Sequence, residues 1–221
     1  SYYPNDKEGY INSSIALISL QNFSEAIDEL NIAVSLFPND FEVNYFLGLA
    51  NYSARNFNQA EQFYSKSLLI DQKSVAAMHG LAMTYDQIEK WDKSDELYTK
   101  LIALNDRDAQ AYNNFAYSLV ERKANLELAL EMSLIANKIQ PNSAPYLDTL
   151  GWIYFHLEQY EKSLEYVQQS YSIDSTNPVI VEHLADILKA MNQISKANLI
   201  YLEAIDIGGD SLQIHQKMLT E

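Results

Sequence analysis

The sequence contains no cysteine, which excludes a disulfide framework, a thiolate nucleophile and a zinc site with cysteine ligands. Proline and glycine are scarce, with five and six residues, and this argues against an all-β protein built on many tight turns. Basic residues are also few, because 15 lysines and arginines stand against 30 aspartates and glutamates. Since nucleic-acid binding requires clustered positive charge, we expect no nucleic-acid partner. No apolar run approaches the roughly 18 residues of a membrane span, so we expect no membrane insertion by this segment.

The chain repeats itself with a period of about 34 residues. A small residue recurs at spacings of 34, 34, 35, 34 and 34, at Ala26, Ala60, Ser94, Ala129, Ser163 and Ala197. A large apolar residue precedes each of these by three positions, at Phe23, Phe57, Trp91, Leu126, Tyr160 and Ile194. A second small residue keeps the same frame, at Ser14, Gly48, Ala82, Ala116, Gly151 and Ala185. The frame divides 7–211 into six repeats, 7–40, 41–74, 75–108, 109–143, 144–177 and 178–211.

Within a repeat, the apolar residues follow a helical period in two halves. In 41–74 the first half places residues at spacings of three and four, at Tyr45, Gly48, Leu49 and Tyr52. The polar stretch 54–58 then predicts a tight turn between two helices. Prolines stand only where a helix tolerates them, with Pro38 and Pro141 ending repeats and Pro145 and Pro178 in first turns. The sequence therefore predicts one helical hairpin per repeat.

This two-helix repeat resembles the tetratricopeptide repeat. The matching residues in the second repeat are Leu47, Gly48, Phe57, Ala60, Tyr64 and Ser67. Those in the fourth are Tyr112, Phe115, Ala116, Leu119, Ala129, Ala136 and Pro141. The resemblance implies an all-α, right-handed superhelical solenoid, in which the first helices line a concave groove and the second helices form the convex wall. The fourth repeat holds one extra residue near Ala124, which we expect to lengthen its turn.

Both ends of the sequence extend past the six repeats. Residues 1–6 resemble the end of the first repeat, so we expect them to be the tail of a preceding one. Residues 212–221 are expected to form a capping helix or the start of a seventh repeat, with an apolar face of Leu212, His215, Met218 and Leu219. In the first helix we expect an uncovered apolar stripe, to be covered by an upstream repeat or by a second copy, at Ile11, Ile15 and Ile18.

No arrangement of residues predicts catalysis, a cofactor or a metal site. The histidines lie in different parts of the repeat frame without metal-ligand spacing, at His79, His156, His183 and His215. Phosphate-binding glycine loops and a nucleophile elbow are missing from the sequence. Among 30 carboxylates, close pairs arise by chance and do not indicate acid–base chemistry. We therefore expect a protein that is not an enzyme and that binds no cofactor.

The resemblance also implies which side chains face a ligand, because in this family they come from the second, fifth, ninth, twelfth and thirteenth positions of a repeat. The candidate groove residues are Tyr45, Leu49, Tyr52, His79, Met83, Asp86, Asn113, Tyr117, Asp148, Trp152, Phe155, His156, Glu182 and Asp186. Lys189 is the one basic residue at these positions, so the basic clamp that some family members use to hold a C-terminal carboxylate is not expected. Aromatic side chains beside carboxylates favour an apolar or basic peptide, and packing between repeats is the alternative role.

We therefore expect a non-enzymatic scaffold or adaptor that binds a peptide or protein segment in the groove. Two alternatives are a regulatory or substrate-recruiting module of a larger enzyme, and a scaffold that associates with copies of itself. Segments 112–119 and 147–154 look like a pairing seen in bacterial envelope proteins of this family. This resemblance favours the periplasmic side of a bacterial envelope, with the cytoplasm as the alternative location.

Overall fold

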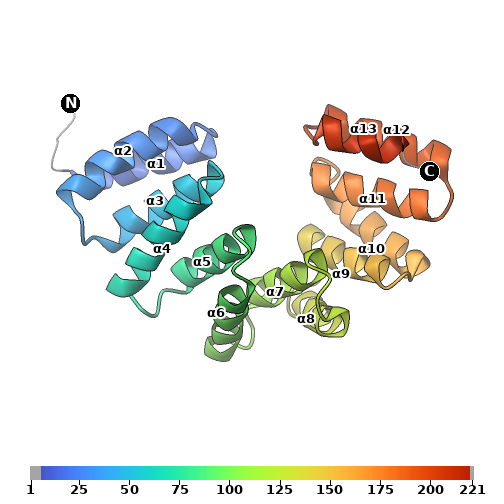
Figure 1. Ribbon diagram of the computed structural model, residues 1–221, viewed down its shortest axis with the longest axis horizontal. Coiled ribbons are helices and arrows are strands. Elements are labelled where there is room, and N and C mark those ends of the chain that lie inside the picture. Colours follow the sequence, from blue (N-terminus) through green and yellow to red (C-terminus); the bar gives the residue numbers. More distant parts are fainter. Residues whose placement is uncertain (1–5, 220–221) are drawn as a thin grey trace. The chain divides into compact units, whose positions relative to one another are not determined.

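The computed structural model describes residues 6–219, and these residues form thirteen α-helices and no strand (Figure 1). The all-α prediction is therefore confirmed. In chain order the helices are α1 (Lys7–Ser19), α2 (Phe23–Leu36), α3 (Phe41–Ser53), α4 (Phe57–Ile70), α5 (Val75–Gln87), α6 (Trp91–Leu104), α7 (Ala109–Glu121), α8 (Leu126–Ile139), α9 (Ala144–His156), α10 (Tyr160–Ile173), α11 (Pro178–Ala190), α12 (Ile194–Asp206) and α13 (Ser211–Leu219). Among residues 6–219, no helix has both the length and the hydrophobicity needed to cross a bilayer.

Consecutive helices pack as antiparallel pairs, from α1 with α2 to α11 with α12, and α13 packs against α12. Thirteen helices arranged in this way agree with six helical hairpins followed by one further helix. The chain divides into two compact units. The N-terminal unit, Ser1–Asp106, contains α1 to α6, and the C-terminal unit, Arg107–Glu221, contains α7 to α13. Within each unit the first helices of successive hairpins are also in contact. Examples are the contact of α3 with α5 and the contact of α9 with α11.

Small residues stand where the two helices of a hairpin meet. The six small residues that begin with Ala26 are all completely buried. A Cβ added at Gly48 would lie 2.8 Å from the ring atom Cδ1 of Tyr64. At Gly151 an added Cβ would lie 2.4 Å from Cγ2 of Val167. The repeat frame therefore marks the positions at which the backbones of paired helices approach most closely.

The turn inside each hairpin contains a residue with a left-handed backbone, at Gln21, Arg55, Glu89, Lys123, Glu158 and Asn192, and the turn between α7 and α8 contains a second one, Asn125. This conformation reverses the chain within three residues in five of the six hairpins. Between α7 and α8 the turn has four residues, 122–125, so the predicted effect of the extra residue is confirmed. Its last residue, Asn125, accepts a hydrogen bond from the Leu128 amide at 3.2 Å and thereby caps α8.

The predictions for the two ends of the chain are partly wrong. Ile11 is only 4% exposed and packs in a cluster with Val43, whereas Ile15 is 39% exposed, so the expected stripe is not uncovered along its whole length. In α13 the completely buried side chain is Ile214, while Leu212 is 73% exposed. Met218 of the predicted face does pack against the same cluster, so the buried face overlaps the predicted one but is centred on Ile214. The tail predicted for 1–6 lies outside the described residues except for Asp6.

Candidate functional site

Six of the candidate residues lie in the N-terminal unit, where contacts with second helices hold several of them. Tyr45 on α3 is half-buried, and its ring centroid lies 5.8 Å from that of Tyr64 on α4. Asp86 on α5 accepts a hydrogen bond from the Tyr98 hydroxyl of α6 at 2.7 Å. Burial and the Asp86 carboxylate together raise the pKa of Tyr52. Leu49 and Met83 are half-buried, and His79 is 7% exposed. These side chains are therefore largely packed, with limited area left for a ligand.

Tyr52 also lines an open surface pocket of about 360 Å³ at the turn edge of the N-terminal unit. The other lining residues are Ser53, Arg55, Phe57 and Gln87. The rings of Tyr52 and Phe57 meet edge to face, with centroids 5.5 Å apart. This pocket faces the turns between helices, so the repeat positions from which the candidates were chosen do not account for it.

Eight candidates lie in the C-terminal unit, and Trp152 of α9 is at the centre of the group they form. Its indole N–H donates a hydrogen bond to Glu121 of α7 at 2.9 Å. Its ring stacks on His183 of α11, with centroids 3.9 Å apart and planes 10° from parallel. Phe155 stacks on it as well, at 4.7 Å and 5°. Trp152 therefore joins three successive first helices, and packing between repeats is part of its role.

A buried ion pair lies beside Trp152. The Nδ1 atom of His183 is 3.0 Å from both carboxylate oxygens of Asp148, and the two residues are 7% and 5% exposed. Burial by itself would lower the pKa of His183, but the charges of Asp148, Asp186 and Glu121 outweigh it and raise that pKa. For His156, burial and the positive charge of Lys123 lower the pKa instead. The two histidines of this group thus differ in the charge that their surroundings favour.

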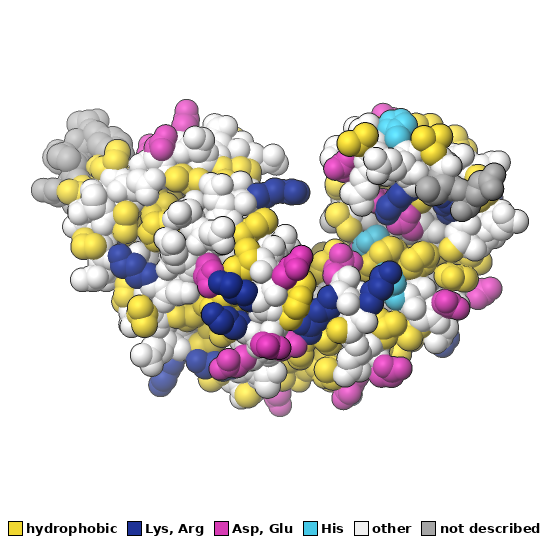
Figure 2. Space-filling model, in the orientation of Figure 1, with side chains coloured by type: hydrophobic (Ala, Val, Ile, Leu, Met, Phe, Trp, Pro, Cys, Tyr) yellow, Lys and Arg dark blue, Asp and Glu magenta, His cyan; other side chains and the backbone are white. Residues whose placement is uncertain are grey.

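The acidic candidates of α11 hold a basic residue of the same chain. Lys217 of α13 lies 2.7 Å from Glu182 and 2.5 Å from Asp186. Asp186 also accepts a hydrogen bond from the Tyr201 hydroxyl of α12. One lysine of the same chain therefore faces two of the acidic candidates and offsets part of their charge. On the visible face of this unit, acidic and basic side chains lie next to each other (Figure 2).

Two candidates on α7 differ in accessibility. Tyr117 is 36% exposed, and it stands one helical turn before Glu121, the residue that contacts Trp152. Asn113 is 7% exposed, and its amide oxygen has no hydrogen-bond partner within the described residues. The accessible part of the candidate site in this unit, which we call the first-helix face, consists of Tyr117, Trp152, Phe155 and His156.

The candidate residues chosen from the sequence did not include Tyr201, Lys217 or His183. Tyr201 lies 15 residues from Asp186 in the same hairpin, so its spacing carries no signal of a contact between repeats. A usable signal was present for His183 and Lys217, because the Trp152–Glu121 and Lys217–Asp186 pairs are 31 residues apart and the His183–Asp148 pair is 35 residues apart. Such separations are close to one repeat, so they place two residues on neighbouring first helices. Charged or aromatic residues at those separations are candidates for contacts between repeats.

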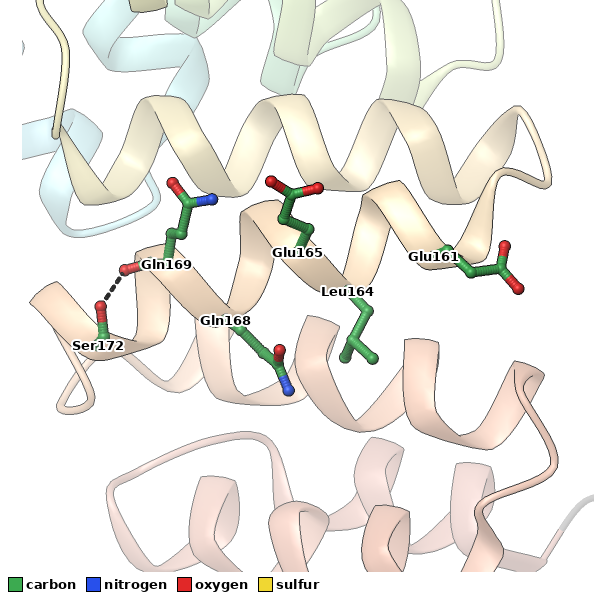
Figure 3. Close-up of a pocket in the computed structure, with 6 residues that line it drawn as sticks. All are labelled: Glu161, Leu164, Glu165, Gln168, Gln169 and Ser172. Carbon is green, nitrogen blue, oxygen red and sulfur yellow. Dashed lines mark hydrogen bonds between the residues drawn. The ribbon is translucent and has the colours of Figure 1, made fainter.

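The C-terminal unit also has an open pocket of about 420 Å³. All of its lining side chains project from α10, a second helix (Figure 3), and they are Glu161, Leu164, Glu165, Gln168, Gln169 and Ser172. No basic side chain or histidine lines it. Within residues 6–219, no group of three or more histidines, aspartates or glutamates is arranged to hold a metal ion. The first-helix face is therefore the stronger candidate for a binding surface.

Two parts of the chain, residues 13–76 and 144–177, match family models described as tetratricopeptide repeat. Comparison with the curated proteins gave no match. Among solved structures, the chain is similar to PilF of Pseudomonas aeruginosa, with 25% identity, 79% of each chain covered and a TM-score of 0.66. It is also similar to YrrB, described as a TPR protein with an unusual peptide-binding site, with 20% identity and a TM-score of 0.58 over 80% of this chain and 91% of that chain. A third similar structure is the Cut9–Hcn1 complex, with 14% identity and a TM-score of 0.84 over 98% of this chain and 43% of that chain. Residues 13–76 and 144–177 are therefore tetratricopeptide repeats, and the helical hairpins of the described chain agree with a tetratricopeptide repeat fold.

Proposed function

We propose that this protein is a non-catalytic scaffold that binds a segment of another protein on the first-helix face of its C-terminal unit. Tetratricopeptide repeats generally form protein-interaction modules, which supports the general part of the proposal. The specific part rests on one observation: this face has an exposed aromatic side chain and another aromatic side chain that neighbouring helices hold in place. Tyr117 of α7 is 36% exposed, while Trp152 of α9 is held by contacts with α7 and α11.

Rigid aromatic side chains are suited to binding because they offer a large contact area and lose little freedom when a ligand arrives. Trp152 is restrained by one hydrogen bond and by stacking contacts with His183 and Phe155. A partner segment would therefore meet a preformed surface. Apolar side chains would contact the aromatic rings, and polar groups at the rim would set the register of the segment.

The partner's chemistry follows from the charges on this face. Asp148 is buried in its pair with His183 and is not accessible to a ligand cation, whereas the exposed Glu121 accepts from the Trp152 indole through one oxygen. We therefore expect apolar contacts to supply most of the affinity. The net charge of −15 acts at longer range, and it favours faster association with segments that also carry basic residues.

The test is affinity capture from the organism that makes the protein, followed by mass spectrometry. The informative variants are Tyr117→Ala and Phe155→Ala, because truncating Trp152 would also remove its contacts with Glu121 and His183 of the neighbouring repeats. The matched control is Leu199→Ala on α12, a second helix, where the side chain is 68% exposed. We expect the wild type and Leu199→Ala to capture the same partner, and the other two variants to lose it. Undiminished capture by Tyr117→Ala and Phe155→Ala, with helicity unchanged, would refute the proposal.

A further inference from the structure

Helix α13 is attached to the C-terminal unit through the buried Ile214, the partly buried Met218 and the charged Lys217. Ile214 is completely buried within the apolar cluster that includes Leu184 and Ala204. Lys217, three positions later, reaches Glu182 and Asp186 of α11. Leu212 and Leu219 are 73% and 84% exposed, so they add little to the attachment. The helix thus binds with an aliphatic residue followed three positions later by a lysine.

The surface that receives Lys217 is built to hold a cation. The side chains of Glu182 and Asp186 are only 16% and 11% exposed, and the Tyr201 hydroxyl of α12 donates to the second oxygen of Asp186. Two carboxylates shielded from water in this way are unfavourable without a positive partner. Lys189 adds a third contact, because its ammonium group donates to the backbone carbonyl of Lys217 in the last turn of α13. The receiving surface therefore recognises an apolar side chain, a cation and the end of a helix.

The attached helix buries few side chains, so a helix that supplies the same cation and apolar groups can compete with it. Its described part, Ser211–Leu219, has nine residues. Only one of its side chains is buried, and elements with few buried contacts open at low free-energy cost. A competing helix with the same three features could therefore replace α13 without disturbing the α11–α12 hairpin.

We propose that this surface, which we call the α13 receptor (Leu184, Glu182, Asp186, Lys189, Tyr201 and Ala204), binds a short basic amphipathic helix of a partner protein. Helix α13 is then an internal occupant that competes with the partner. The partner helix carries an aliphatic residue three positions before a lysine or arginine. The proposal deepens the proposed function and rests on it, because it names the chemistry of a partner segment for the first helices of the same unit.

The test uses the full-length chain and a fluorescent synthetic peptide with the sequence of residues 210–219, Asp-Ser-Leu-Gln-Ile-His-Gln-Lys-Met-Leu. Fluorescence anisotropy measures its binding to the wild type and to the Lys217→Gln variant. We expect Lys217→Gln to bind the peptide about tenfold more tightly, because its own α13 has lost the charged contact and competes less well. Ile214→Ala weakens α13 through its apolar contact instead, and it should raise peptide affinity in the same direction.

Matched controls identify the binding surface. Lys196→Gln removes an exposed lysine of α12 that contacts Gln193, and it should leave peptide binding at the wild-type level. Adding Glu182→Gln and Asp186→Asn to Lys217→Gln should abolish binding. A peptide whose lysine is replaced by glutamine should also fail to bind to Lys217→Gln. Circular dichroism confirms that each variant keeps its helical content.

Three results would overturn the proposal. One is equal peptide affinity for the wild type, Lys217→Gln and Ile214→Ala, or no binding to any of them. Another is binding that survives the Glu182→Gln and Asp186→Asn substitutions. The third is a wild-type dimer, detected by light scattering, that Lys217→Gln converts to monomer, because this would assign the receptor to a second copy of the chain. None of these results bears on capture through Tyr117 and Phe155, so the proposed function can stand or fall separately.

Discussion

At Gly151 the helices α9 and α10 approach so closely that a side chain does not fit. A Cβ there would lie 2.4 Å from Cγ2 of Val167 and 3.1 Å from the carbonyl oxygen of Ser163. Both groups are completely buried and cannot move aside. We therefore expect Gly151→Ala to lower the free energy of unfolding by about 1–3 kcal/mol, measured by urea denaturation, although alanine favours a helix.

Gly9 provides the matched control for this substitution. It also lies inside a helix, but a Cβ there would meet only the side chain of Asp6, at 3.0 Å from Oδ2. Asp6 is exposed and free to rotate, so Gly9→Ala should leave stability unchanged or raise it by up to about 1 kcal/mol. If both substitutions had the same effect, close helix approach would not be the reason for glycine at 151.

The buried pair of His183 and Asp148 makes stability depend on pH. The pKa of His183 is raised in the folded protein, since the charges of Asp148, Asp186 and Glu121 more than offset burial. Its stabilising contribution is therefore complete below the ordinary histidine value of about 6.5, and it is lost as the pH rises through the raised value. The pKa of His156 is lowered, so this residue changes stability only at pH values below the ordinary histidine pKa. It therefore does not mask the effect of His183 at higher pH.

The measurement is the difference in unfolding free energy between the wild type and His183→Gln, followed from about pH 6 to about pH 9. We expect this difference to shrink as the pH rises. A protonated histidine that stacks on an indole quenches the fluorescence of the indole. Because His183 stacks on Trp152 and loses its proton as the pH rises, Trp152 fluorescence should increase over the same range. A difference that stays constant or grows with pH would show that His183 is not held in its charged form.

On the scale of the elements, the turn inside each hairpin decides where one helix ends and the next begins. Glu158, between α9 and α10, has a φ of 57°, a conformation that is unfavourable for residues with a Cβ. Glu158→Gly should therefore raise the free energy of unfolding by about 0.5–1 kcal/mol, once the greater freedom of glycine in the unfolded chain is included. Thermal or urea unfolding measures the change.

The neighbouring residue supplies the comparison. Gln159 has a φ of −94°, so glycine brings no relief there, and Gln159→Gly should be neutral or destabilising. A Glu158→Gly variant that is less stable than both the wild type and Gln159→Gly would contradict the role given to this turn. Asn192, at the same place in the last hairpin, should gain less from glycine because asparagine tolerates the left-handed region better.

The helices and their turns could be predicted from the sequence because apolar periodicity, small residues and prolines all marked the same boundaries. The longer turn before α8 followed from one extra residue in the repeat frame. The orientation of α13 could not be predicted in this way. Its sequence permits a face with Leu212 or a face with Ile214, and only packing against α12 decides between them.

The candidate site was predicted less well than the fold, for a physical reason. The frame identified Trp152, Asp148 and Asp186 as residues of first helices, but it did not show which of them are used within the protein. The partners lie 31 or 35 residues away, and in the N-terminal unit Lys7 reaches residues at separations of 33 and 35. Several separations fit neighbouring helices, so spacing alone does not assign the pairs.

On the scale of the whole molecule, both compact units follow the same plan of paired helices whose small residues meet. The charge of −15 is a property of the entire chain, and it acts on partners before contact is made. The association rate constant for a basic partner should therefore fall as salt is added. The dissociation rate constant should change less, because it depends mainly on the apolar contacts made after docking. Stopped-flow association at two salt concentrations, with the partner found by capture, separates these contributions.

The central claim is that a partner segment lies on the first helices of the C-terminal unit. Site-specific photocrosslinking in the organism that makes the protein tests it most directly, with p-benzoylphenylalanine placed at position 117 on α7 or at position 199 on α12. Tyr117 and Leu199 are 36% and 68% exposed, so a crosslinker at either position is accessible to a partner. Accessibility alone therefore does not favour crosslinking from position 117. We predict a crosslinked partner from position 117 and none from position 199. Crosslinks from position 199 without any from position 117 would contradict the account.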